Sequence, residues 1–172
     1  CPWTSPCAAT LQFRVSHELP RRWTSTPFPA YAHRPGRTPH PVTDPRGHSF
    51  GAPHPVPVGP PPPEQWRACE AYLLGVDLFN HAYWWEAHEA WESCWRALLP
   101  GSTQARFLQG LIQVAAHLLK CDAGEEAGAR RVLQRARANL APVIAELRRT
   151  GSERYMGLSV ESWFESLEKP SA

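Results

Sequence analysis

Several features that would assign this protein to a large functional class are missing from its sequence. No apolar stretch approaches 18 residues, so we expect no membrane-spanning helix and no membrane partner. No block of Lys and Arg alternates with aromatic residues, so we expect no nucleic-acid partner. The five cysteines include no C-x-x-C pair and their number is odd, which favours a reducing compartment. The sequence therefore predicts a cytoplasmic protein.

Proline is scarce in the second part of the chain and abundant in the first. Of the 19 prolines, 16 precede Glu64, and five of the eight histidines share that region. From Glu64 onward Ala, Leu, Glu and Arg dominate. Because proline can begin a helix but cannot continue one backward, the boundary lies near Pro63. We predict four parts: a disordered tail (1–26), a proline- and histidine-rich arm (27–63), a helical domain (64–150), and a short C-terminal helix with its tail (151–172).

The arm contains the sequence GHSFG at 47–51, which matches the G-x-S-x-G pattern of a nucleophile elbow. Such an elbow requires a buried strand before the serine and a helix after it. Proline-rich stretches flank Ser49 on both sides, and proline cannot occupy a central strand. We therefore interpret GHSFG as a turn, within an arm that presents His40 and His48.

Beyond Pro63 the apolar residues recur at steps of three and four, which is typical of amphipathic helices. Polar, proline or glycine residues interrupt the pattern at 80–81, 100–101, 122–128 and 150–152. The sequence predicts an all-α fold, a compact bundle of about four main helices arranged as helical hairpins, with the irregular arm packed over one face. The expected helices span 64–79, 82–99, 103–121 and 128–149, with a short fifth at 159–169.

The second expected helix carries the densest group of reactive side chains, in HEAWE at 88–92. At 100° per residue Glu92 lies about 40° from His88 on one side of the helix, whereas Glu86 points nearly opposite. The segment resembles the zinc motif H-E-x-x-H with glutamate as the second ligand. One hypothesis makes His88 and Glu92 ligands of a divalent metal such as zinc, with Glu89 as the catalytic base. The alternative places His88 in the core, bonded to Glu92, with Glu86 and Glu89 in solvent.

The third expected helix is apolar almost all round, so we expect it at the centre of the fold. A polar stripe interrupts it at Gln109, Gln113 and His117, which follow one another at steps of four. A buried polar group without a partner costs about 1–3 kcal/mol, so the stripe needs partners. We expect these partners in the HEAWE segment or among the arm histidines. Gly110 would let a neighbouring helix approach closely.

Three blocks of this sequence are similar to a known family: YLLGVDLFNHAYWWEAHEAWESCW (72–95), RFLQGLIQVAAHLLK (106–120) and GARRVLQRARANL (128–140). They resemble the small all-helical bacterial and plastid proteins grouped as domain of unknown function 309. The resemblance extends over residues 27–148 and implies packed helical hairpins, but it implies no activity. One departure is Ala82, where the family often has glycine. The matching polar positions that direct the search for a site are Glu86, His88, Glu89, Glu92 and Gln109.

Two functions are consistent with these patterns. The first is a binding or interaction module that uses the His/Glu/Gln cluster of the second and third helices. Such a module could form a homo-oligomer through the Trp-rich second helix or through the amphipathic fourth helix. The second is a metal-dependent hydrolase in which His88, Glu92, His40 and His48 bind the metal and Glu89 is the base. The sequence leaves open whether the protein is an enzyme and what its substrate or other partner is.

Overall fold

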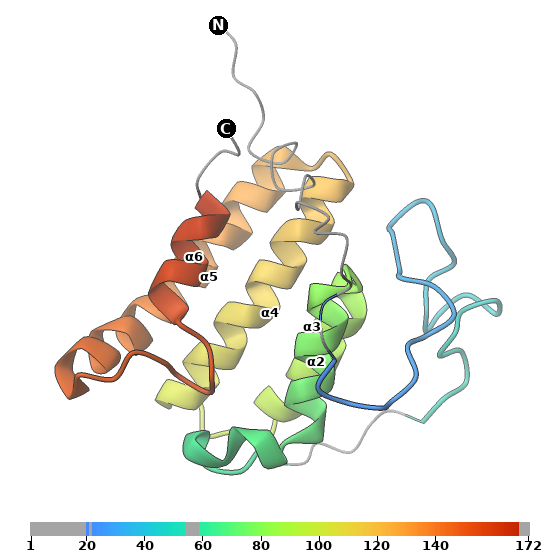
Figure 1. Cartoon of the computed structure of the whole chain (residues 1–172). Helices are drawn as coiled ribbons and strands as arrows, with labels where there is room; N and C mark the ends of the chain where they lie inside the picture. The colour runs from blue at the N-terminus through green and yellow to red at the C-terminus, as the bar shows by residue number, and fades with distance from the viewer. Residues whose placement is uncertain (1–19, 21, 54–58, 169–172) are drawn as a thin grey trace, which may run out of the picture.

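The computed structural model describes residues 20, 22–53 and 59–168, and these residues form an all-helical bundle (Figure 1). No strand occurs in this part of the chain, where an isolated bridge pairs Tyr155 with Leu158. The all-α prediction is therefore confirmed. The helices are η1 (Pro63–Ala68), a 3₁₀ helix, followed by α2 (Glu70–Asn80), α3 (Trp84–Trp95), α4 (Thr103–Asp122), α5 (Glu126–Thr150) and α6 (Val160–Glu168).

Consecutive helices pack as hairpins, α2 against α3 and α4 against α5, and α4 joins the two pairs by packing on α3 as well. Figure 1 shows α4 between the α2–α3 pair and the α5–α6 side of the molecule. The prediction that this helix lies at the centre is confirmed, because Phe107, Leu108 and Val114 have no exposed surface. Each such side chain stabilises the fold by about 1.5–3 kcal/mol through its burial.

Two features of α4 depend on single residues. Ser102 caps its first turn, where the hydroxyl accepts the Ala105 N–H at 3.2 Å. Gly110 faces Leu140 of α5, and a β-carbon at Gly110 would lie 2.5 Å from the leucine Cδ2. The close approach expected at Gly110 is thus to α5, and it is possible only because glycine has no side chain.

The first predicted helix is two helices. The segment expected at 64–79 divides at Cys69, whose backbone is extended (φ −93°, ψ 91°). The prolines before η1 supply no N–H donors, and this first part winds as a 3₁₀ helix with Gln65 outside helical geometry. The helix expected at 82–99 is shorter than predicted, because α3 begins at Trp84 and ends at Trp95.

The arm lies along the α2–α3 side of the bundle, in blue and teal in Figure 1. Residues 22–26, which we expected in a disordered tail, have defined positions and contact α2. None of the helices in the described ranges is long and apolar enough to cross a bilayer.

Candidate functional site

A fully buried carboxylate on α2 fixes the segment that precedes the arm. Asp77 is 0% exposed. Its Oδ1 accepts the Trp23 N–H at 2.8 Å, and its Oδ2 accepts both the N–H and the hydroxyl of Thr24 at 2.8 Å. A buried charge is tolerated where several donors surround it. The path of residues 22–24 therefore depends on a side chain of α2.

Glu86 on α3 holds the arm in the same way. It is 5% exposed. Its Oε1 accepts the His33 N–H at 2.8 Å and lies 2.9 Å from His48 Nε2. Its Oε2 is buried and has no hydrogen-bond partner among the described residues. The interpretation of Glu86 as a solvated residue is therefore wrong. Residues two positions apart in a helix lie about 200° apart around its axis, so Glu86 does point away from His88. The arm, however, covers that side of α3.

The two arm histidines predicted as metal ligands lie beside Trp85 of α3. The ring centroids of His40 and His48 are 5.7 and 6.2 Å from the Trp85 ring. His48 reaches α3 with both nitrogens engaged, Nε2 at Glu86 and Nδ1 at 2.9 Å from Ser49 Oγ. His40 Nδ1 accepts two backbone N–H groups of the following turn at 3.3 Å, so the neutral ring carries its proton on Nε2. In this arrangement both rings order the arm.

The HEAWE segment forms a separate group on the other side of α3. One ligand atom from each of His88, Glu89 and Glu92 lies within 4.8 Å of the others. The His88 side chain is 28% exposed and its Nδ1 lies 3.3 Å from the Glu89 carboxylate, so it is not the core residue that one alternative expected. Glu92 pairs with Arg96 at 3.0 Å. The structure brings these three predicted residues together. The arm histidines lie outside the group, because His48 docks at Glu86 and His40 packs against Trp85.

The polar stripe of α4 faces α5 at two of its three positions. Gln113 accepts a side-chain N–H from Asn139 at 3.0 Å. His117 is buried, and its Nδ1 lies 3.0 Å from the Ala129 carbonyl oxygen of α5. Burial lowers the pKa of His117 below its ordinary value. The expectation that Gln113 and His117 contact the HEAWE segment or the arm is wrong, because this side of α4 packs on α5. The third residue of the stripe, Gln109, is half-buried.

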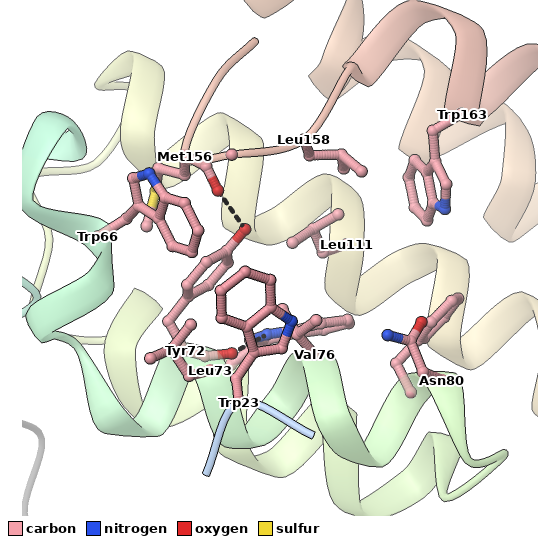
Figure 2. Close-up of a pocket in the computed structure, with 13 residues that line it drawn as sticks. Trp23, Trp66, Tyr72, Leu73, Val76, Asn80, Leu111, Met156, Leu158 and Trp163 are labelled. Carbon is pink, nitrogen blue, oxygen red and sulfur yellow. Dashed lines mark hydrogen bonds between the residues drawn. The ribbon is translucent and has the colours of Figure 1, made fainter. Parts of the chain in front are cut away.

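A cavity of about 110 Å³ lies between α2, α4 and the segment that leads into α6 (Figure 2). Figure 2 shows Trp66 and Trp23 toward one side of the cavity and Trp163 above Asn80 on the other. The residues that line it come from the region before the arm, from η1 and four of the α-helices, and from the turn at 156–158. Its six aromatic residues are Trp23, Trp66, Tyr72, Phe79, Trp91 and Trp163.

Most polar atoms of the pocket wall already have partners. The Tyr72 hydroxyl donates to the Met156 carbonyl at 2.9 Å, and Trp91 Nε1 donates to the Tyr72 carbonyl at 3.2 Å. Burial raises the pKa of the Tyr72 phenol far above its ordinary value. Asn80 is exposed, and its amide lies at the edge of the pocket. None of the described lining residues carries a charge.

Sequence reasoning did not single out this pocket. The helical spacing marks Tyr72, Phe79 and Trp91 as apolar, but a filled core and a hollow one have the same spacing. The remaining aromatic walls come from residues far apart in the chain, including Trp23 before the arm and Trp163 in α6. The available signal was the excess of tryptophan, eight in 172 residues, which is more large aromatic surface than helix seams alone require.

Comparison with protein families gives one result. Residues 72–132 match the model of the family described as Domain of unknown function (DUF309). Neither the curated proteins nor the solved structures contain a match to this chain. The matched range includes the HEAWE segment, Glu86 and much of the pocket wall, and it lies inside the 27–148 range of the sequence resemblance without reaching the arm. The chain therefore contains a domain of unknown function 309 over residues 72–132.

Proposed function

We propose that this protein is a binding module whose ligand presents one neutral aromatic ring to the pocket of Figure 2. The observation that carries the proposal is the cavity of about 110 Å³ with six aromatic residues in its wall. Protein interiors are ordinarily packed as closely as organic crystals, so a hollow of this size among large side chains is a built feature. Most small-molecule sites are concave and apolar with few polar groups.

The size and chemistry of the wall restrict the ligand. An apolar cavity of about 150 Å³ holds a benzene molecule, so this smaller hollow, which opens at one side, accommodates one ring rather than a fused system. Stacked and edge-on contacts with aromatic walls contribute about 0.5–1.5 kcal/mol beyond burial. With no charge in the wall, an ionised group would lose its hydration without compensation. Asn80 offers a hydrogen bond to one polar substituent at the edge.

The test uses toluene as the probe of the intact protein. We expect saturation transfer from protein to toluene in NMR, together with a change in tryptophan emission, because four tryptophans line the cavity. Val76→Phe places a ring in the cavity from α2 and should abolish both signals. Leu74→Phe is the matched control, since Leu74 is half-buried on the same helix but does not line the pocket. Equal toluene binding by Val76→Phe and the wild type would refute the proposed site.

A second candidate follows from the group on the exposed side of α3. Ligand atoms of His88, Glu89 and Glu92 lie within 4.8 Å of one another, and one imidazole with two carboxylates is a donor set that zinc accepts. We propose a divalent metal such as zinc here, with the remaining coordination open to water, as a metal-dependent hydrolase requires. In this form Glu89 is a ligand instead of the base, and His40 and His48 contribute to the docked arm.

Equilibrium dialysis with zinc tests this candidate. We expect one zinc per wild-type chain and none in His88→Ala. His81→Ala is the control, because His81 lies at the end of α2 with its Nδ1 at 2.7 Å from the Asp77 carbonyl. Wild-type protein that retains no zinc under these conditions would eliminate the metal, and with it the hydrolase.

A further inference from the structure

Two cysteines, one just before α2 and one in α3, meet in the core beside the aromatic pocket. Cys69 lies at the junction of η1 and α2, and Cys94 lies in the last turn of α3. Their Sγ atoms are 3.8 Å apart, and the residues are 7% and 1% exposed. Both are free thiols. The extended backbone of Cys69 interrupts what would otherwise be one long helix, and it is this residue whose thiol meets α3.

The environment of the pair gives the two sulfurs different chemistry. The hydrogen bond between the two thiols lowers the pKa of Cys69 to about 6. The same interaction, together with burial, raises the pKa of Cys94 well above its ordinary value. Of the two thiols, Cys69 is therefore the one that ionises more readily. The thiolate is the form that reacts with peroxides and disulfides.

We propose that Cys69 and Cys94 form an oxidisable dithiol, a modification site that closes into a disulfide between the start of α2 and the end of α3. A disulfide needs its sulfurs about 2.05 Å apart, so each Sγ moves about 0.9 Å from its place in the reduced pair. The oxidant is a hydroperoxide as small as hydrogen peroxide, because only a small molecule reaches thiols this deeply buried.

The reaction proceeds in two balanced steps. The Cys69 thiolate attacks one peroxide oxygen, the O–O bond breaks, and a sulfenic acid forms while hydroxide leaves. Cys94 then attacks the Cys69 sulfur, the S–O bond breaks, and the second hydroxide departs and takes up the Cys94 proton as water. The first hydroxide takes up the proton that Cys69 releases when it ionises, so in sum two thiols and one hydrogen peroxide give one disulfide and two waters. An external dithiol such as dithiothreitol reverses the change.

The sequence makes the pair easy to measure in the wild-type protein. No Lys or Arg lies between Arg67 and Arg96, so trypsin releases both cysteines in one peptide, 68–96, whereas the other three cysteines fall in other peptides. The protein is treated with hydrogen peroxide, denatured in iodoacetamide, digested and weighed. We expect peptide 68–96 to carry two alkyl groups before oxidation. After oxidation it should carry none and be lighter by about 2 Da than the unalkylated dithiol.

Three readouts keep the proposal falsifiable. The oxidation rate should fall as the pH drops below about 6, where the Cys69 thiolate takes up its proton. The oxidised protein should melt about 5–10 °C higher, because the bond closes a loop of the unfolded chain without straining the fold. Cys94→Ser should stop at the sulfenic acid of Cys69, which dimedone traps.

Persistence of two alkylated cysteines in peptide 68–96 after oxidation would overturn the proposal, as would a disulfide from either one to another cysteine. A lower melting temperature on oxidation would also contradict it, because the reduced geometry would then oppose the bond. Trp66 and Tyr72, three residues to either side of Cys69, line the aromatic pocket. The dithiol nevertheless stands independently of the proposed ligand, since none of these measurements uses toluene.

Discussion

The two buried carboxylates that hold the N-terminal region should respond differently to removal of their charge. Asp77 uses both oxygens, because Oδ1 and Oδ2 each accept a backbone N–H, from Trp23 and Thr24. In Asp77→Asn an NH₂ group replaces one of the two oxygens, whichever way the amide is oriented. This NH₂ donor must then face the backbone N–H donor of either Trp23 or Thr24. Glu86 uses only Oε1 for its two donors, and Oε2 has no partner in the part of the chain that the structure describes. Glu86→Gln can keep Oε1 in place.

These contacts give the expected magnitudes. Loss of one hydrogen bond to a charged group costs about 1.5–3 kcal/mol, which corresponds to roughly 10- to 100-fold faster exchange of the affected amides. We therefore expect that acceleration at Trp23 and Thr24 in Asp77→Asn. In Glu86→Gln the bonds persist without charge assistance, so exchange at His33 should accelerate by roughly fivefold or less, for a cost of about 1 kcal/mol.

The assay is native-state hydrogen exchange of the amides of residues 22–33, measured by NMR on the intact protein. Asp44→Asn is the control, because Asp44 is a partly exposed acid of the arm that pairs with the nearby Arg46. It should leave these amides unchanged. Equal acceleration in Asp77→Asn and Glu86→Gln, or a larger effect in Glu86→Gln, would refute the reasoning from oxygen usage.

Two further predictions concern single positions in the bundle. Ala82 has a positive φ of 63° in the turn between α2 and α3. Ala82→Gly should therefore raise the free energy of unfolding, measured in urea, by about 0.5–1 kcal/mol. A loss of stability would contradict the assignment of backbone strain at this position. Burial lowers the pKa of His117 from 6.5, so the unfolded chain binds this proton more readily than the folded one. The free energy of unfolding should therefore be fully retained above about pH 6.5 and decline as the pH falls from 6.5 through the lower folded pKa. Urea titrations at a series of pH values should show a shallower decline in His117→Gln. An unchanged slope in this variant would exclude His117 as the source of the decline.

Much of the fold could be predicted because local chemistry determines it. The breaks at Asn80–His81, Pro100–Gly101 and 150–152 and the spacing of apolar residues between them identified the helices, since helix periodicity and the effect of proline and glycine are properties of short stretches. The prediction of one helix over 64–79 failed at Cys69, where an extended backbone separates the 3₁₀ helix η1 from α2. The resemblance to domain of unknown function 309 also identified the helical core correctly, over a shorter range than expected.

The site was less predictable because it depends on which faces meet. Helix arithmetic placed Glu86 opposite His88 correctly, but it could not show that the arm covers that face and buries the carboxylate. It grouped His88, Glu89 and Glu92, and their ligand atoms do lie together. It could not assign Gln113 and His117 to α5, because a polar stripe on a helix does not specify which of two neighbours it faces.

By itself the sequence determined that residues after Pro63 form helices, that α4 is the central one, and that the proline-rich arm carries no nucleophile elbow. Only the tertiary structure decided that Asp77 and Glu86 hold the N-terminal region, that Cys69 meets Cys94, and that aromatic residues from Trp23 to Trp163 surround one hollow. The physical reason is the range of the interactions. Periodicity and turn chemistry act within a few residues, whereas each of these contacts joins residues 25 or more positions apart, and their pairing depends on how the helices pack.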